Sequence, residues 1–152
     1  MKKIVLVLFL MLGVVSFSIP KYVDANKLQK NFYKILQDTQ DTFIFGKSTQ
    51  DTGLTVALFN IDDKGGIKKM SEKVKNTAPA SQKFVSSREN KRAYIHKFKD
   101  QAGGYTYSFV GKNTKVKNCC ISVLYTSDKN FKDDELDKVI DKTLNEIESF
   151  LK

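Results

Sequence analysis

The spacing of apolar residues changes along the chain from helical to strand-like and back to helical. In residues 24–38, the apolar positions Leu28, Phe32, Ile35 and Leu36 follow the i, i+4, i+7, i+8 order that places side chains on one helical face. An Asp and an Asn near the start of this segment are available as N-caps. We therefore predict a short amphipathic helix over residues 24–38.

Two segments rich in aromatic and branched residues come next, at 42–45 and 54–61, with a polar loop between them. This arrangement predicts two strands joined as a hairpin. A turn with two adjacent glycines then precedes Ile67, Met70 and Val74, which share one helical face. We predict a second helix here, short, bordered by lysines and ending before the next proline.

The apolar period becomes two between residues 83 and 126, with turn residues at 89–91, 100–104 and 111–114. Four antiparallel strands fit this spacing. A six-residue apolar stripe in 133–152 follows three acidic residues, which predicts a C-terminal helix. About six strands with helices at the start, middle and end bury their apolar faces by packing helices on a largely antiparallel sheet. The expected class is α+β.

The first residues have the pattern of a secretory signal peptide. Lys2 and Lys3 precede an apolar run over residues 4–15, and Ser16-Phe17-Ser18 then places small residues at the positions that a signal peptidase recognises. The run is shorter than the roughly 20 residues that cross a bilayer, so an uncleaved anchor is the less favoured alternative. We expect a periplasmic or secreted protein without a transmembrane segment after cleavage. The expected organisation is a signal peptide (1–18) and a single α+β domain (19–152), comprising an N-terminal helical segment (19–41) and a core (42–152).

The charge balance points to an anionic partner or to a solubilising surface. The chain has 26 Lys and Arg against 17 Asp and Glu, and 24 against 17 remain without Lys2 and Lys3. An exported basic protein meets lipid head groups, anionic polymers and envelope proteins, and no sequence-specific nucleic-acid partner is expected. With one histidine and two adjacent cysteines, multi-histidine zinc sites and iron–sulfur clusters lack ligands. We expect no metal and no cofactor. The oligomeric state stays open.

One distinctive surface is predicted from alternating rings. Tyr94, His96 and Phe98 alternate on one expected strand, and a second aromatic stripe lies on the next, so a matched hairpin brings six rings to one face. Such a face is either core beneath a helix or a platform that stacks on a sugar or base and is edged by lysines. The second stripe is Tyr105, Tyr107 and Phe109. The candidate ligand-binding residues are Tyr94, His96, Phe98, Tyr105, Tyr107, Lys97, Lys99, Lys115 and Lys117.

His96 and the two cysteines are the remaining chemical candidates. One hypothesis is that the neutral imidazole of His96 serves as a general base or as an axial haem ligand. The alternative is that His96 is a structural residue of the sheet whose ring nitrogens are hydrogen-bonded. Cys119 and Cys120 are adjacent on a strand, so their thiols are expected on opposite faces. A strained vicinal disulfide acting as a redox switch, or an intermolecular bridge, is the alternative. A Cys–His nucleophile pair requires His96 to meet one of these thiols.

Four segments carry a resemblance to a known family. Residues 54–60 lead into the 67–74 helix, 90–94 form a turn into an aromatic strand, 120–125 form the last strand, and Ile147–Phe150 close the final helix. Over residues 42–152 this order resembles the PsbP-like family, named for an extrinsic photosystem II subunit and related to a Ran-binding nuclear import factor. The resemblance implies an α/β/α sandwich and a non-enzymatic docking module. It supplies no catalytic residues.

The expected function is therefore an exported, non-enzymatic binding or accessory module of the bacterial envelope. It would dock a protein partner or an anionic ligand through its sheet and its lysine-rich surface. The alternative is a small secreted hydrolase that uses His96.

Overall fold

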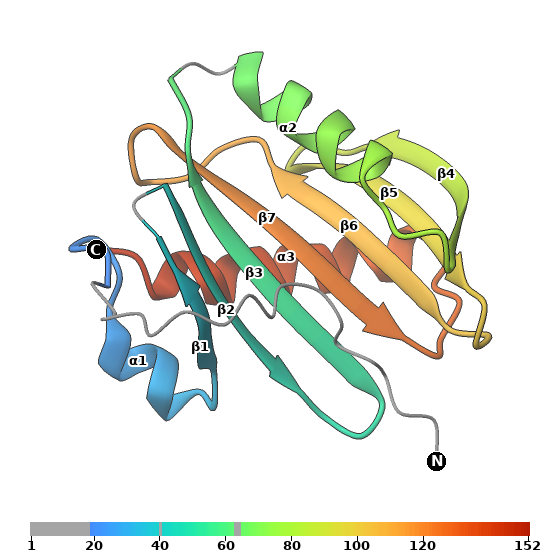
Figure 1. The fold of residues 1–152 in the computed structure, drawn as a ribbon, viewed down its shortest axis with the longest axis horizontal. Coiled ribbons are helices and arrows are strands. Elements are labelled where there is room, and N and C mark those ends of the chain that lie inside the picture. The colour runs from blue at the N-terminus through green and yellow to red at the C-terminus, as the bar shows by residue number, and fades with distance from the viewer. Residues whose placement is uncertain (1–18, 40, 63–64) are drawn as a thin grey trace.

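The computed structural model describes residues 19–39, 41–62 and 65–152 (Figure 1). The predicted signal peptide lies outside the described residues. Ten elements are present in the described part of the chain, three helices and seven strands. In order they are α1 (Ala25–Lys30), β1 (Lys34–Asp38), β2 (Thr42–Ser48), β3 (Thr52–Asn60), α2 (Gly65–Asn76), β4 (Gln82–Glu89), β5 (Ala93–Asp100), β6 (Tyr105–Gly111), β7 (Cys119–Ser127) and α3 (Asp133–Ser149).

The strands form one antiparallel sheet in the order β1-β2-β3-β7-β6-β5-β4. The first three strands make one meander, and β4, β5 and β6 make a second. Strand β7 lies between the two meanders and pairs with β3 from Thr52↔Ser127 to Asn60↔Cys119. The α+β class with an antiparallel sheet is thus confirmed, with seven strands in place of about six.

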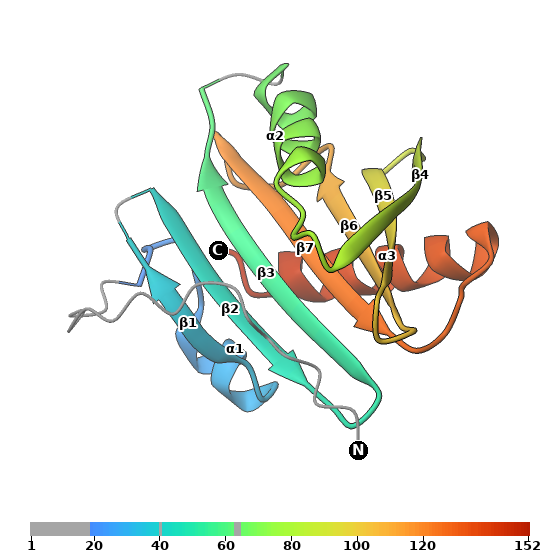
Figure 2. The same ribbon diagram turned by 45° about the vertical axis from the view of Figure 1, so that its right-hand side comes forward.

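Helices α2 and α3 lie on opposite faces of the sheet (Figures 1 and 2). The larger hydrophobic cluster lies on the α3 side, where Leu136, Ile140, Leu144 and Ile147 are buried. A smaller cluster on the other face contains Ile67 of α2 together with residues of β6 and β7. Apolar side chains are therefore buried on both faces of the sheet. This explains why neither face of the strands is uniformly polar.

The predicted hairpin, the two later helices and the four antiparallel strands are confirmed. Helix α3 begins as its acidic first turn predicts: the Glu135 Oε2 atom accepts a hydrogen bond of 3.1 Å from the Lys132 backbone N–H. Carboxylates at this end also offset the positive pole of the helix dipole. In α2, Ile67 is buried and Met70 is half-buried against the smaller cluster.

The helix predicted over residues 24–38 is wrong in its second half. Helix α1 ends at Lys30, and Lys34–Asp38 form strand β1, which pairs with β2. At the turn between them Phe32 has a left-handed φ of 64°. Tyr33 is turned into the core, where its ring meets Phe45 and Phe150 edge-on. Pairing with β2 stabilises residues 34–38 more than a helix would, although their apolar spacing is helical. A short stretch of sequence does not show which distant strand it will pair with.

Candidate functional site

The two predicted aromatic stripes lie on opposite faces of the sheet. Strand β5 pairs with β6 so that His96 lies opposite Ser108 and Lys97 lies opposite Tyr107. Directly opposed residues of an antiparallel pair project to the same face. The prediction that six rings share a face is therefore wrong, because the register differs by one residue from the one it needs. Tyr94, His96 and Phe98 are on the α2 side, and Tyr105, Tyr107 and Phe109 are on the α3 side.

Burial removes most of the predicted stacking surface. His96, Phe98 and Tyr107 are buried, while Tyr94 and Tyr105 are half-buried. The Tyr107 hydroxyl donates to the Lys129 carbonyl and accepts from the Phe131 N–H, both at 2.9 Å. Tyr107 thereby fixes the segment that leads from β7 into α3. Ligand binding by this set of residues stays a prediction.

The predicted lysine rim is divided between strand β5 and the connection between β6 and β7. Lys97 Nζ donates to Asn130 Oδ1 and lies 5.2 Å from the centre of the Tyr105 ring. Lys99 is exposed on the same strand, whereas Lys115 and Lys117 are exposed in the connection between β6 and β7. Lys97 and Lys99 therefore lie on the sheet face that carries Tyr105 and Tyr107, and Lys115 and Lys117 belong to a loop.

Both cysteines are free and buried. Cys119 belongs to the cluster beneath α3 and Cys120 to the cluster beneath α2, so the thiols lie on opposite faces, as predicted. Burial raises the pKa of Cys119 to about 11 and the pKa of Cys120 to about 12. Thiols with raised pKa values are poor nucleophiles at neutral pH. This environment favours a structural role over the redox alternatives.

His96 is held between two hydroxyl groups on neighbouring elements. Its Nε2 atom lies 2.7 Å from Ser71 Oγ of α2, and its Nδ1 atom lies 2.6 Å from Ser87 Oγ of β4. A neutral imidazole carries one N–H and one lone pair, so one serine donates to the ring and the other accepts from it. The ring, 2% exposed, thus joins α2, β5 and β4.

The chemical state of His96 follows from its burial. Desolvation lowers the pKa of His96 below its ordinary value of 6.5; Glu72 opposes this shift and Lys75 adds to it. The ring is therefore neutral at pH 7 and able to accept a proton from a hydroxyl. Within the described residues, His96 forms its side-chain hydrogen bonds with two serine hydroxyls. A Cys–His pair would require a thiol at one of these positions. The sequence holds no signal for this arrangement, since 25 positions separate Ser71 from His96.

The burial of His96 predicts a pH dependence of stability. At pH values below about 6.5 the unfolded chain binds a proton at this ring more readily than the folded chain does, so stability falls as the pH decreases. The loss is at most about 1.4 kcal/mol per pH unit. Urea unfolding at pH 7.5 and 5.5, for the natural chain and for His96→Leu, measures it. The natural chain is expected to lose more stability, and equal losses contradict the assignment.

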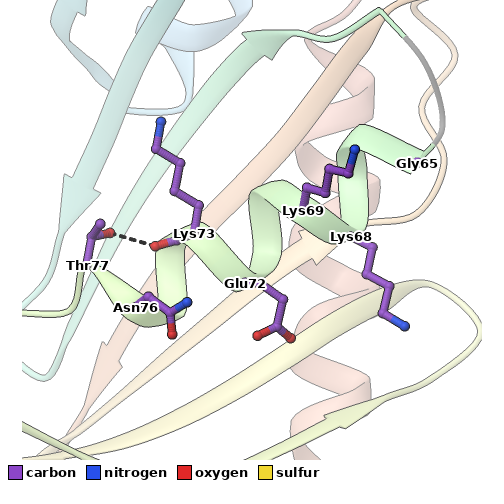
Figure 3. A pocket seen from close by; sticks show the side chains of 7 residues that line it. All are labelled: Gly65, Lys68, Lys69, Glu72, Lys73, Asn76 and Thr77. Carbon is purple, nitrogen blue, oxygen red and sulfur yellow. Dashed lines mark hydrogen bonds between the residues drawn. The ribbon is translucent and has the colours of Figure 1, made fainter.

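Helix α2 carries a basic outer surface. Residues along its length line an open depression, and Lys69 and Lys73 extend to one side of the helix while Lys68 and Glu72 extend to the other (Figure 3). The complete lining is Gly65, Lys68, Lys69, Glu72, Lys73, Asn76 and Thr77.

The lysines of this surface are exposed and have no ion-pair partner among the described residues. Among the described residues, the ion pair on α2 joins Glu72 to Lys75 at 3.7 Å, and no carboxylate lies within ion-pair distance of Lys68, Lys69 or Lys73. Helix α3 has three acidic residues in its first turn and α2 has none. Lys68 and Lys69 instead add positive charge near the positive pole of the α2 dipole. The sequence predicts that lysines border this helix. It does not predict that three of them line the same depression.

No protein-family model matches the chain, and neither a curated protein nor a solved structure matches it at a significant level. The resemblance to the PsbP-like family stays a prediction. Within the described residues, none of the helices combines the length and the apolarity needed to span a bilayer. No group of three or more His, Cys, Asp or Glu side chains in those residues is arranged to hold a metal ion.

Proposed function

We propose that the chain is an exported, non-enzymatic binding module that docks an anionic partner through the outer surface of α2. The observation that carries the proposal is the set of exposed lysines at positions 68, 69 and 73 around one depression. Positive charge gathered on one surface, where Lys68, Lys69 and Lys73 outnumber the one carboxylate of the lining, attracts an anionic ligand and speeds its association. Export is supported by the basic start and apolar run of the first 18 residues.

The arrangement of His96 gives less support to the hydrolase alternative. Ser71 is 1% exposed and lies on the inner side of α2, where a substrate has no access. Ser87 is exposed, but it lies directly opposite His96 on the neighbouring strand, so their hydrogen bond is also an ordinary cross-strand contact. The depression on the outer side of α2 is therefore the better candidate for recognition.

The test is binding of residues 19–152 to dextran sulfate, a defined polyanion, over a range of salt concentrations. The triple variant K68Q/K69Q/K73Q is expected to bind roughly tenfold more weakly, because fewer counterions are released when it binds. The plot of log binding constant against log salt concentration should also be less steep for the triple variant than for the natural chain.

A matched control separates a local site from net charge. The triple variant K117Q/K138Q/K142Q removes the same charge from exposed positions outside α2 and is expected to bind nearly as well as the natural chain. An equal loss in both triple variants would show that net charge alone drives binding, and would overturn the proposal. Absence of binding by the natural chain would overturn it as well.

A further inference from the structure

The end of α1 has the hydrogen bonds of a Schellman motif. The Phe32 N–H donates to the Gln29 carbonyl at 3.0 Å, and the Tyr33 N–H donates to the Leu28 carbonyl at 3.0 Å. Asn31 is the C-cap, so Phe32 occupies the following position, which adopts left-handed backbone and is usually glycine. A phenylalanine at this position is strained, because its Cβ atom disfavours the φ of 64°.

Packing among the described residues does not compensate for this strain. The Phe32 side chain is 85% exposed, whereas the neighbouring Tyr33 is buried against Phe45 and Phe150. The same turn that directs Tyr33 into the core directs Phe32 outward. Strained backbone held in place by the surrounding structure is found at sites of function, which makes Phe32 a candidate contact residue.

The surroundings of Phe32 are basic. Lys30 and Lys34 lie two residues to either side and are exposed, and no described carboxylate lies within ion-pair distance of them. Leu36, four residues after Phe32 on the edge strand β1, is 41% exposed. We call Lys30, Phe32, Lys34 and Leu36 the basic-aromatic tip. It lies at the end of the molecule opposite α2 (Figures 1 and 2).

We propose that the basic-aromatic tip docks the protein onto an anionic phospholipid surface, with the Phe32 ring inserted at the level of the head groups. Aromatic rings are enriched at that depth, and lysines beside them gain from anionic lipid. One ring and two lysines give weak, reversible attachment. Docking at this end leaves the lysines of α2 free to engage a second partner, so this proposal does not depend on the proposed function of α2.

The first test is co-sedimentation with vesicles of phosphatidylcholine, with or without phosphatidylglycerol. It uses residues 19–152, which contain every described element and both hydrophobic clusters. A cooperative thermal unfolding transition is required of each variant as the check that it is folded. Phe32→Gly is expected to weaken binding to phosphatidylglycerol vesicles roughly tenfold. The same change should raise Tm by about 2–4 °C, since glycine accepts the left-handed backbone. Phe84→Ala, which removes an exposed ring from β4, is expected to leave binding unchanged.

Phe32→Trp provides a second readout, because the chain has no tryptophan. Its emission is expected to shift to the blue with phosphatidylglycerol vesicles and to remain unshifted with phosphatidylcholine alone. K30Q/K34Q should weaken binding roughly thirtyfold, at about 1 kcal/mol per lysine. The proposal is overturned if Phe32→Gly binds as tightly as the natural chain, if the tryptophan emission does not shift, or if neutral vesicles bind equally well. A tip that recognises a protein instead would give no vesicle binding at all, which also overturns it.

Discussion

Phe45→Ala is expected to lower the free energy of unfolding by about 3–5 kcal/mol. Phe45 is fully buried in β2. Its ring centroid lies 5.4 Å from that of Tyr33 and 6.4 Å from that of Phe150, in both cases edge-on. The substitution removes a ring that joins the sheet, the turn after α1 and the end of α3. A cavity remains because these three parts are fixed by their own backbone hydrogen bonds.

Urea unfolding monitored by circular dichroism measures this loss. Phe84→Ala is the matched control, since it removes the same ring from a site that is 45% exposed, and its expected cost is below about 1 kcal/mol. A loss of similar size in both variants would contradict the central role of the ring cluster around Phe45.

His96→Leu is expected to lower the free energy of unfolding by about 2–3 kcal/mol, although leucine fills most of the space. The change leaves the Ser71 hydroxyl buried without its partner, and the cost of an unsatisfied buried hydroxyl exceeds the net value of the hydrogen bond that it made. Ser87 is exposed, and water replaces its bond to the ring.

The double variant His96→Leu/Ser71→Ala tests this explanation directly. With both polar partners replaced by apolar groups, part of the loss should be recovered, giving a coupling of about 1 kcal/mol or more in a double-mutant cycle. Ser87→Ala provides the contrast and should cost less than about 1 kcal/mol. Additive losses at positions 71 and 96 would show that the serine and the imidazole are not coupled.

The sequence predicts best those helices and strands in which the spacing of apolar residues stays constant over a long segment. The apolar stripe of α3 and the alternation from β4 to β7 each extend over several turns or strands, so local pattern and tertiary packing agree. Strand β1 is the opposite case. Ile35 and Leu36 fit a helical period by chance, and the pairing of β1 with β2 decides the conformation.

The candidate sites are harder to predict from sequence, because they depend on strand register and on contacts between distant residues. A one-residue difference in the pairing of β5 with β6 sends the rings of His96 and Tyr107 to opposite faces. Ser71 reaches His96 only because α2 packs on β5 and β6. The sequence presents Phe32 as a core residue, and its exposure follows from a single left-handed φ angle, which no apolar period encodes.

The position of β7 has a consequence for how the chain reaches its native state. Strand β3 ends at Asn60, yet its neighbour β7 begins only at Cys119 and is also the strand that holds the second meander. Neither half of the sheet can join the other until nearly all of the polypeptide has left the ribosome. Such late, non-local closure slows folding. Late closure of the sheet is compatible with the proposed export, because a chain that has not yet joined its two meanders can still enter a translocation channel.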